Sequence, residues 1–101
     1  MHQEPFGPLI PILSFKSFDE VIKRANNNKL GLASYIYTNN LEKAHKASEM
    51  METGTVAVNT GVVALPEAPF GGIKQTGYGR EGGSMAIKDY LNIKYTHLGI
   101  K

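Results

Sequence analysis

Between residues 9 and 59, β-prone and helical segments alternate along the chain, and the connections between them are only a few residues long. Strands are predicted over residues 9–15, 32–38 and 55–59, which are rich in apolar and β-branched or aromatic residues. Pro11 interrupts the first of these, so that strand should lie at an edge or an end of its sheet. Strands separated by helices and short connections predict an α/β fold with a short parallel sheet and right-handed crossover helices.

The first helix is expected after Ser17, which stands three residues before Glu20 as in a capping box. Four apolar residues follow with helical spacing and predict its buried face: Phe18, Val21, Ile22 and Ala25. Three consecutive asparagines (residues 26–28) and Gly31 should end the helix, because both residue types tolerate the left-handed cap. A ligand-binding role for the asparagines is the weaker alternative.

A second helix is expected from Asn39, with Glu42 three residues on, to about Glu52, before Gly54. Its inward face is predicted from four residues: Leu41, Ala44, Ala47 and Met51. Residues 60–83 form a long segment rich in glycine and proline, and a loop of this length is usually functional or disordered. A short helix is predicted over residues 84–91 and a final β-prone run over residues 93–100.

The composition excludes several kinds of functional site. A chain of 101 residues allows one domain, and its lack of cysteine excludes a disulfide framework, a thiolate metal site and a cysteine nucleophile within it. A net charge of +2 with acids interspersed gives no reason to expect nucleic acid, and three widely separated histidines predict no metal site. No secretory leader and no apolar run of about 20 residues is evident, so we expect a cytoplasmic protein without membrane contact.

Gly77, Gly79 and Gly82 match the G-x-G-x-x-G pattern of dinucleotide-binding turns. That pattern works where a strand enters the turn and an acidic residue about 20 positions on meets the ribose. Here a loop precedes it and the chain ends before such a residue. The glycines are therefore expected to serve close packing and positive φ angles.

Glu4-Pro5-Phe6-Gly7-Pro8 is a stiff, extended segment, because its two prolines fix φ and remove two donors. It can hold a carboxylate and an aromatic ring in a set relation. A carboxylate accepts from both hydroxyls of a ribose, and a ring can pack on a flat heterocycle. The alternative is a proline-flanked entry to a strand.

Together with the stretch from Pro69 to Glu81 (PFGGIKQTGYGRE), this segment resembles the closing section of the aldehyde dehydrogenase superfamily, and the resemblance extends from about Glu4 to Leu98. It implies that Glu4 binds the nicotinamide ribose and Phe6 lies beside the nicotinamide ring of NAD or NADP. It also implies that Phe70 lines the substrate tunnel, for which aromatic core packing is the alternative. The resemblance places Asn59 near the active site without a chemical role.

The same resemblance implies that residues 1–92 are the C-terminal part of the catalytic domain and residues 93–101 an oligomerisation strand and tail. The family's nucleophilic cysteine, its base and its main dinucleotide fold lie upstream. The chain should therefore contain no catalytic residue, act with the upstream part and an aldehyde substrate in a homo-oligomer, and be inactive alone. The tail and the Gly79-Arg80-Glu81-Gly82 segment most resemble succinate-semialdehyde dehydrogenases, although residues 63–66 lack the serine that many of them carry.

Two other interpretations stay open. The chain can be a non-catalytic truncated product, in which an internal methionine of a longer frame has become Met1. It can also be a stand-alone nucleotide-binding module, which would require measurable NAD⁺ affinity in the isolated chain. An uninterrupted upstream frame would contradict the first of these.

Overall fold

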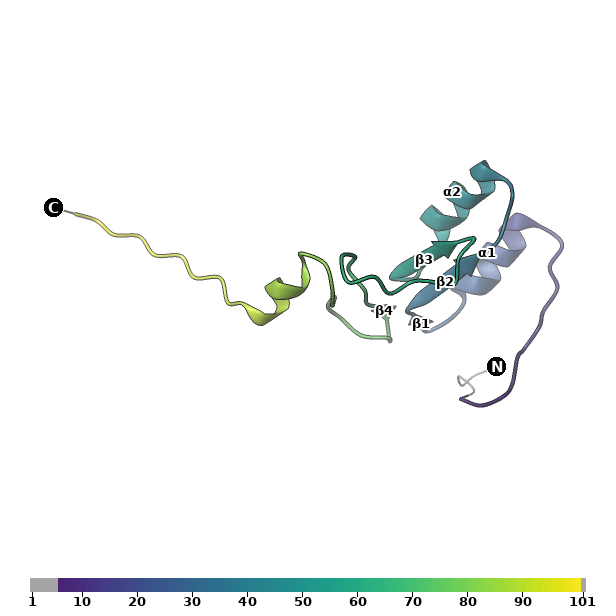
Figure 1. Cartoon of the computed structure of the whole chain (residues 1–101), viewed down its shortest axis with the longest axis horizontal. Helices are drawn as coiled ribbons and strands as arrows, with labels where there is room; N and C mark the ends of the chain where they lie inside the picture. The colour runs from purple at the N-terminus through teal and green to yellow at the C-terminus, as the bar shows by residue number, and fades with distance from the viewer. Residues whose placement is uncertain (1–5, 101) are drawn as a thin grey trace.

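The computed structural model describes residues 6–100 (Figure 1). The elements in chain order are α1 (Phe18–Asn26), β1 (Leu30–Gly31), β2 (Ala33–Ile36), α2 (Leu41–Met50), β3 (Thr55–Val58), β4 (Ile73–Lys74) and the 3₁₀ helix η1 (Ala86–Tyr90). The predicted α/β character is confirmed. The helix predicted over residues 84–91 is present as the shorter 3₁₀ helix η1.

The sheet content is two separate strand pairs. β2 and β3 run parallel, with Ala33 opposite Thr55 and Ile36 opposite Val58, and α2 connects them. Parallel pairing across a helix is the arrangement predicted for this part of the chain. β1 pairs with β4 in the antiparallel direction, with Gly31 opposite Ile73. This second pair brings the glycine-rich segment back to the helices and was not predicted.

The start of α1 follows the predicted cap. Ser17 Oγ accepts a hydrogen bond from the Glu20 amide at 3.2 Å. The Glu20 carboxylate reaches back one residue further than expected and accepts from the Lys16 amide at 2.8 Å. It also pairs with Arg24 at 3.1 Å. The Lys16 N–H is the main cause that holds the pKa of Glu20 below its ordinary value.

The end of α1 differs from the prediction. Asn27 caps the helix with φ −76°, so no left-handed residue ends it. The Asn26 side chain instead joins α1 to the segment after α2, donating to the Met50 carbonyl at 2.7 Å and accepting from the Glu52 amide at 2.9 Å. Of the predicted buried face, Ile22 is buried, whereas Ala25 is exposed.

α2 begins one residue later than predicted. Its N-cap is Asn40, whose side chain accepts from the Lys43 amide at 2.8 Å. Ala44 and Ala47 are buried as expected. The prediction for Leu41 is wrong, because its side chain is exposed at the first turn of the helix.

The predicted strand over residues 9–15 is wrong. This segment is extended, and it pairs with no strand among residues 6–100. Its apolar side chains lie exposed, with Ile10 and Ile12 among the most open in the chain. β-propensity produces a strand only where a neighbouring edge supplies the hydrogen bonds, and Pro11 also lacks a donor.

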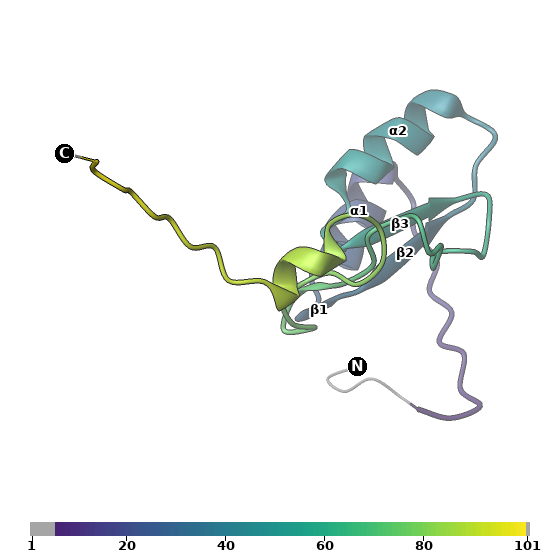
Figure 2. The same cartoon turned by 60° about the vertical axis from the view of Figure 1, so that its left-hand side comes forward.

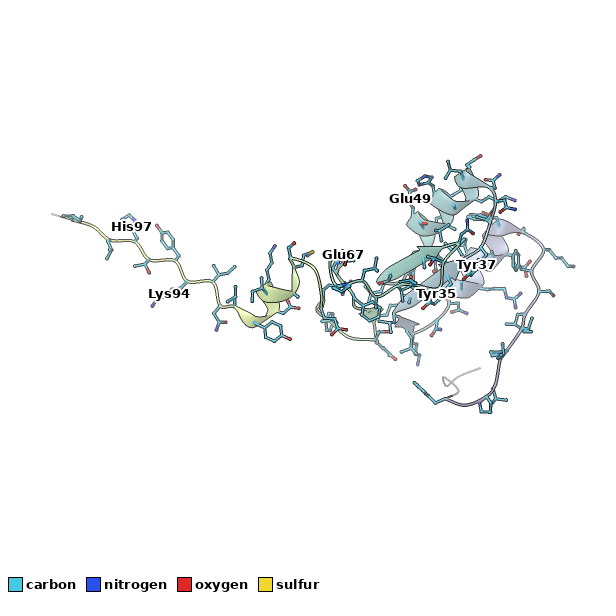
Figure 3. All side chains as sticks on the ribbon, viewed as in Figure 1. Tyr35, Tyr37, Glu49, Glu67, Lys94 and His97 are labelled. Atoms are coloured by element: carbon cyan, nitrogen blue, oxygen red, sulfur yellow. The ribbon has the colours of Figure 1, made fainter. Side chains whose placement is uncertain are left out.

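The segment after η1 runs away from the folded part in both views (Figures 1 and 2). Lys94 and His97 lie along this extended stretch, far from Tyr35 and Tyr37 at the sheet (Figure 3). Residues 93–100 are exposed and make no strand pair within the described part of the chain. Their predicted pairing with another subunit stays a prediction.

The core is small. The buried apolar residues are Ile22, Ala44, Ala47 and Ala57, which come from the two helices and β3. The accessible surface is 8991 Å², whereas a compact protein of 11.0 kDa exposes about 5,600 Å². The radius of gyration is 18.6 Å, against about 13 Å for a compact domain of this length. Much of the apolar surface of this chain is therefore left uncovered.

Candidate cofactor and substrate site

A shallow groove of about 370 Å³ lies along the glycine-rich segment. The segments on either side of β4, the residue after β1 and the end of η1 contribute to it, and its lining includes Leu32, Phe70, Tyr78, Arg80, Asp89 and Tyr90. Three aromatic residues, one cationic residue and two acidic residues, Glu81 and Asp89, thus line the same hollow. The groove contains the residue that sequence analysis assigned to the substrate tunnel.

Phe70 is held at this groove by its backbone. It forms an isolated antiparallel bridge with Glu81, in which the Phe70 amide donates to the Glu81 carbonyl at 2.7 Å and the Glu81 amide returns a bond of 2.8 Å. The Phe70 side chain is half-buried. A ring in this position can pack on the protein and still present one side to a ligand, so both interpretations of Phe70 agree with its surroundings.

Arg80 stiffens the loop around Phe70. Its Nη1 donates to the carbonyls of Gly72 at 2.8 Å and Gly79 at 2.7 Å. Its backbone amide donates to Asp89 Oδ2 at 3.0 Å, which ties the loop to η1. The sequence analysis named Arg80 as part of a motif and predicted no role for Arg80 or Asp89. An arginine among several glycines was the available signal.

The glycines of the G-x-G-x-x-G pattern have the backbone role that was predicted. Gly77, Gly79 and Gly82 have φ angles of 121°, 91° and 73°. A Cβ on Gly82 would also lie 2.6 Å from the Ala68 carbonyl oxygen. The element that follows is a five-residue 3₁₀ helix, so the pattern does not lead into the α-helix that a phosphate-binding turn requires.

Asn59 directly follows β3 and has a positive φ of 55°. Its side chain accepts from the Thr38 amide and donates to the Thr38 carbonyl, both at 2.9 Å. These two bonds continue the pairing of β2 and β3 beyond the ends of both strands. Both groups of the Asn59 side-chain amide are thus bonded to the Thr38 backbone.

Of the two predicted cofactor residues, only Phe6 is described, and no hydrogen bond or strand pair among residues 6–100 brings it to the groove. The side chain of Phe6 is 94% exposed at the start of the extended N-terminal stretch. Glu4 lies outside the described residues. The roles of Glu4, Phe6 and Phe70 therefore stay predictions.

Two further properties concern the described residues alone. Residues 6–100 contain no cluster of three or more histidine, aspartate or glutamate side chains that could hold a metal ion. None of the helices found there has the length and apolar character needed to cross a membrane.

Comparison with known proteins identifies one family for nearly the whole chain. The sequence model of the aldehyde dehydrogenase family matches residues 1–96. The chain is 51% identical over 98 residues to 3-sulfolactaldehyde dehydrogenase of Pseudomonas putida and 46% identical to the NADP(+) succinate-semialdehyde dehydrogenase of Escherichia coli. Each alignment covers 97% of this chain and 20% of the relative, so the chain spans about a fifth of the length of the curated relatives it matches.

Solved structures of aldehyde dehydrogenases also match the fold of this chain. Succinate-semialdehyde dehydrogenase from Burkholderia pseudomallei superimposes with a TM-score of 0.89 at 44% identity, covering 93% of this chain and 20% of that one. The NAD⁺ complex of an aldehyde dehydrogenase from Bacillus cereus gives a TM-score of 0.89 at 43% identity, with coverage of 95% and 20%.

Proposed function

This chain belongs to the aldehyde dehydrogenase family, and on that premise we propose that it supplies the C-terminal segment of an NAD(P)-dependent enzyme that oxidises an aldehyde to a carboxylic acid. The observation that carries the proposal is the match of nearly the whole chain to one fifth of its relatives. The large uncovered surface of the described fold supports it, because a segment that completes a larger domain buries such surface against the remainder.

The residues of this chain would bind and orient the cofactor and the aldehyde. The nicotinamide cofactor, when bound, supplies the hydride acceptor for aldehyde oxidation. Phe6 suits a place beside its ring, because the Phe6 side chain is free of packing within the described fold. Glu4 would accept from the ribose hydroxyls, and Phe70 would shape the path of the aldehyde. The nucleophilic thiol must come from elsewhere, since this chain has no cysteine.

We further propose that the substrate is an aldehyde with an anionic group at its other end. The relatives are named for succinate semialdehyde, glutarate semialdehyde and 3-sulfolactaldehyde, and each of these aldehydes carries a carboxylate or a sulfonate. Succinate semialdehyde is the first of these to test. Residues 1–92 would complete the catalytic domain, and residues 93–101 would pair with another subunit.

The test replaces the matching C-terminal segment of the Escherichia coli enzyme with this chain. We expect the hybrid to oxidise succinate semialdehyde with NAD⁺ or NADP⁺, and the isolated 101-residue chain to show no turnover. Phe70→Ala should raise the aldehyde KM in the hybrid, while Glu4→Gln should raise the cofactor KM. A folded hybrid without activity, or robust turnover by the isolated chain, would contradict the proposal.

The alternative is a non-catalytic truncated product. Both interpretations predict an inactive isolated chain, so the coding sequence upstream of Met1 decides between them. A stop codon or frameshift directly upstream would favour the truncated product. A continuous frame that encodes a dinucleotide fold and a cysteine would favour the enzyme.

A further inference from the structure

The side chain of Lys74 crosses from the glycine-rich segment to the end of α1. Its Nζ donates to the Asn26 carbonyl at 2.9 Å and to the Asn28 carbonyl at 3.2 Å, and lies 2.5 Å from Glu52 Oε2. A lysine ammonium has three N–H donors, and each finds an acceptor here. The side chain is only 24% exposed, so water competes little for these positions.

The acceptors come from separate stretches that are already joined. Asn26 is the last residue of α1, Asn28 follows the helix, and Glu52 lies in the turn between α2 and β3. The Asn26 side chain binds the Met50 carbonyl and the Glu52 amide, so these stretches are held together without Lys74. The ammonium group therefore enters a site whose acceptors other contacts have placed.

The backbone of Lys74 is unusual as well. Its φ is 58°, in the left-handed region that glycine adopts most easily. Backbone strain of this kind persists where the surrounding structure fixes the residue, and it gathers at functional sites. The lysine here keeps a side chain at a position whose backbone favours glycine, which agrees with a role for its ammonium group.

Lys74 also lies close to Phe70 along the chain, with Gly71, Gly72 and Ile73 between them. On one side, the bridge of Phe70 with Glu81 and the bond from Arg80 to the Gly72 carbonyl fix the segment. On the other side, Lys74 fixes it to the α1 end. Phe70 thus lies within the first anchor, and Lys74 forms the second anchor four residues further along the chain.

We propose that Lys74 is a positioning residue, whose ammonium group locks the glycine-rich segment onto the end of α1 and so sets the place of Phe70. The lock follows from the contacts of this chain alone. Its consequence for aldehyde binding rests on the proposed function. The two parts are tested by different measurements.

The absence of cysteine makes the lock testable by chemical rescue. Lys74→Cys has a unique thiol, which is alkylated in denaturant before refolding. Bromoethylamine restores a terminal ammonium with sulfur in place of one methylene, whereas iodoacetamide gives a neutral amide of similar length. Lys43→Cys, at an exposed lysine of α2, is the matched control for both reagents.

The readout is hydrogen exchange of the Gln75 amide, which donates to the Lys29 carbonyl at 2.9 Å beside the lock. We expect exchange about tenfold faster with the neutral side chain at position 74 and near the parent rate with the ammonium. The Asn59 amide, bonded to the Ile36 carbonyl at the far end of β3, reports global opening and should not respond. Equal rates for the two alkylated forms, or no protection of Gln75 in the parent chain, would overturn the proposal.

The consequence for Phe70 is measured in the hybrid enzyme. Lys74→Met should raise the aldehyde KM about fivefold and leave kcat within about twofold, because the aldehyde path shifts while the reacting groups stay in place. Lys74→Arg should not rescue KM, since a planar guanidinium does not match a site built for a compact ammonium. Unchanged KM in Lys74→Met would overturn the link to Phe70. A hybrid with no turnover at all would count against the proposed function, while hydrogen exchange would still decide the lock.

Discussion

Gly54 lies directly before β3, against the backbone of the glycine-rich segment. A Cβ at this position would overlap the Gly71 carbonyl oxygen and lie 3.1 Å from the Gly72 Cα. Its φ is not in the left-handed region, so the requirement is for space and not for conformation. Close backbone approach is the use of glycine that most directly fixes Phe70 relative to the helices.

We expect Gly54→Ala to lower the free energy of unfolding of the hybrid enzyme by about 1–3 kcal/mol, because neither backbone can move without breaking other contacts. Urea unfolding measures it. Gly61→Ala is the control, since nothing lies within 4 Å of a Cβ built there. Similar losses of unfolding free energy in the two variants would show that the glycine-rich segment can move to accommodate a Cβ at Gly54.

Single residues of the site could be predicted from the sequence only where a motif names them. The glycines have the predicted positive φ angles. Phe70 lines the groove, and its place in a substrate tunnel stays a prediction. The lock at Lys74 could not be predicted, because its carbonyl acceptors lie 46 and 48 residues away along the chain. Local patterns carry no information about contacts of that separation.

At the scale of elements, the sequence predicts what is decided locally. Caps and helical spacing located α1 and α2 to within a residue or two, and β2 and β3 lie inside their predicted ranges. Strands need a partner, however, and residues 9–15 find none in the described chain, whereas β1 and β4 pair across more than 40 residues. These pairings depend on the assembled fold.

The N-terminal turn of α1 should respond to acid. The lowered pKa of Glu20, caused chiefly by the Lys16 N–H, means that the folded helix favours the ionised carboxylate. Its stabilisation is therefore present above the pKa of the unfolded chain and is lost as the pH falls through the lower, folded pKa. The carboxylate is exposed, so the effect should be small.

Helical circular dichroism of a hybrid or of the chain, followed as the pH is lowered, measures this loss. Glu20→Gln should remove part of the pH dependence, whereas Asp19→Asn, in the same turn, is the matched control and should retain it. Equal pH dependence in both variants would show that the Glu20 contacts do not stabilise the helix.

Ser17→Ala should lower the stability of α1 by about 1 kcal/mol at every pH, because the helix loses its N-cap.

For the whole molecule, the extended ends matter most. Residues 91–100 extend away from the folded part, and residues 6–13 form an extended stretch ahead of α1 (Figure 1). Exposed apolar side chains in such number mark surfaces that another chain or another part of the same protein covers. This agrees with a segment that completes a larger enzyme.

The C-terminal stretch allows a direct test of that view. An unpaired β-prone segment invites pairing with another chain, and Ile93 and Leu98 are exposed there. We expect the isolated chain to associate as its concentration rises, as measured by light scattering after size exclusion. Ile93→Lys with Leu98→Lys should keep it monomeric. Thr96→Lys with His97→Lys adds the same number of lysines but keeps the apolar residues, so this control should still associate. A parent chain that stays strictly monomeric at high concentration would contradict a pairing role for residues 93–100.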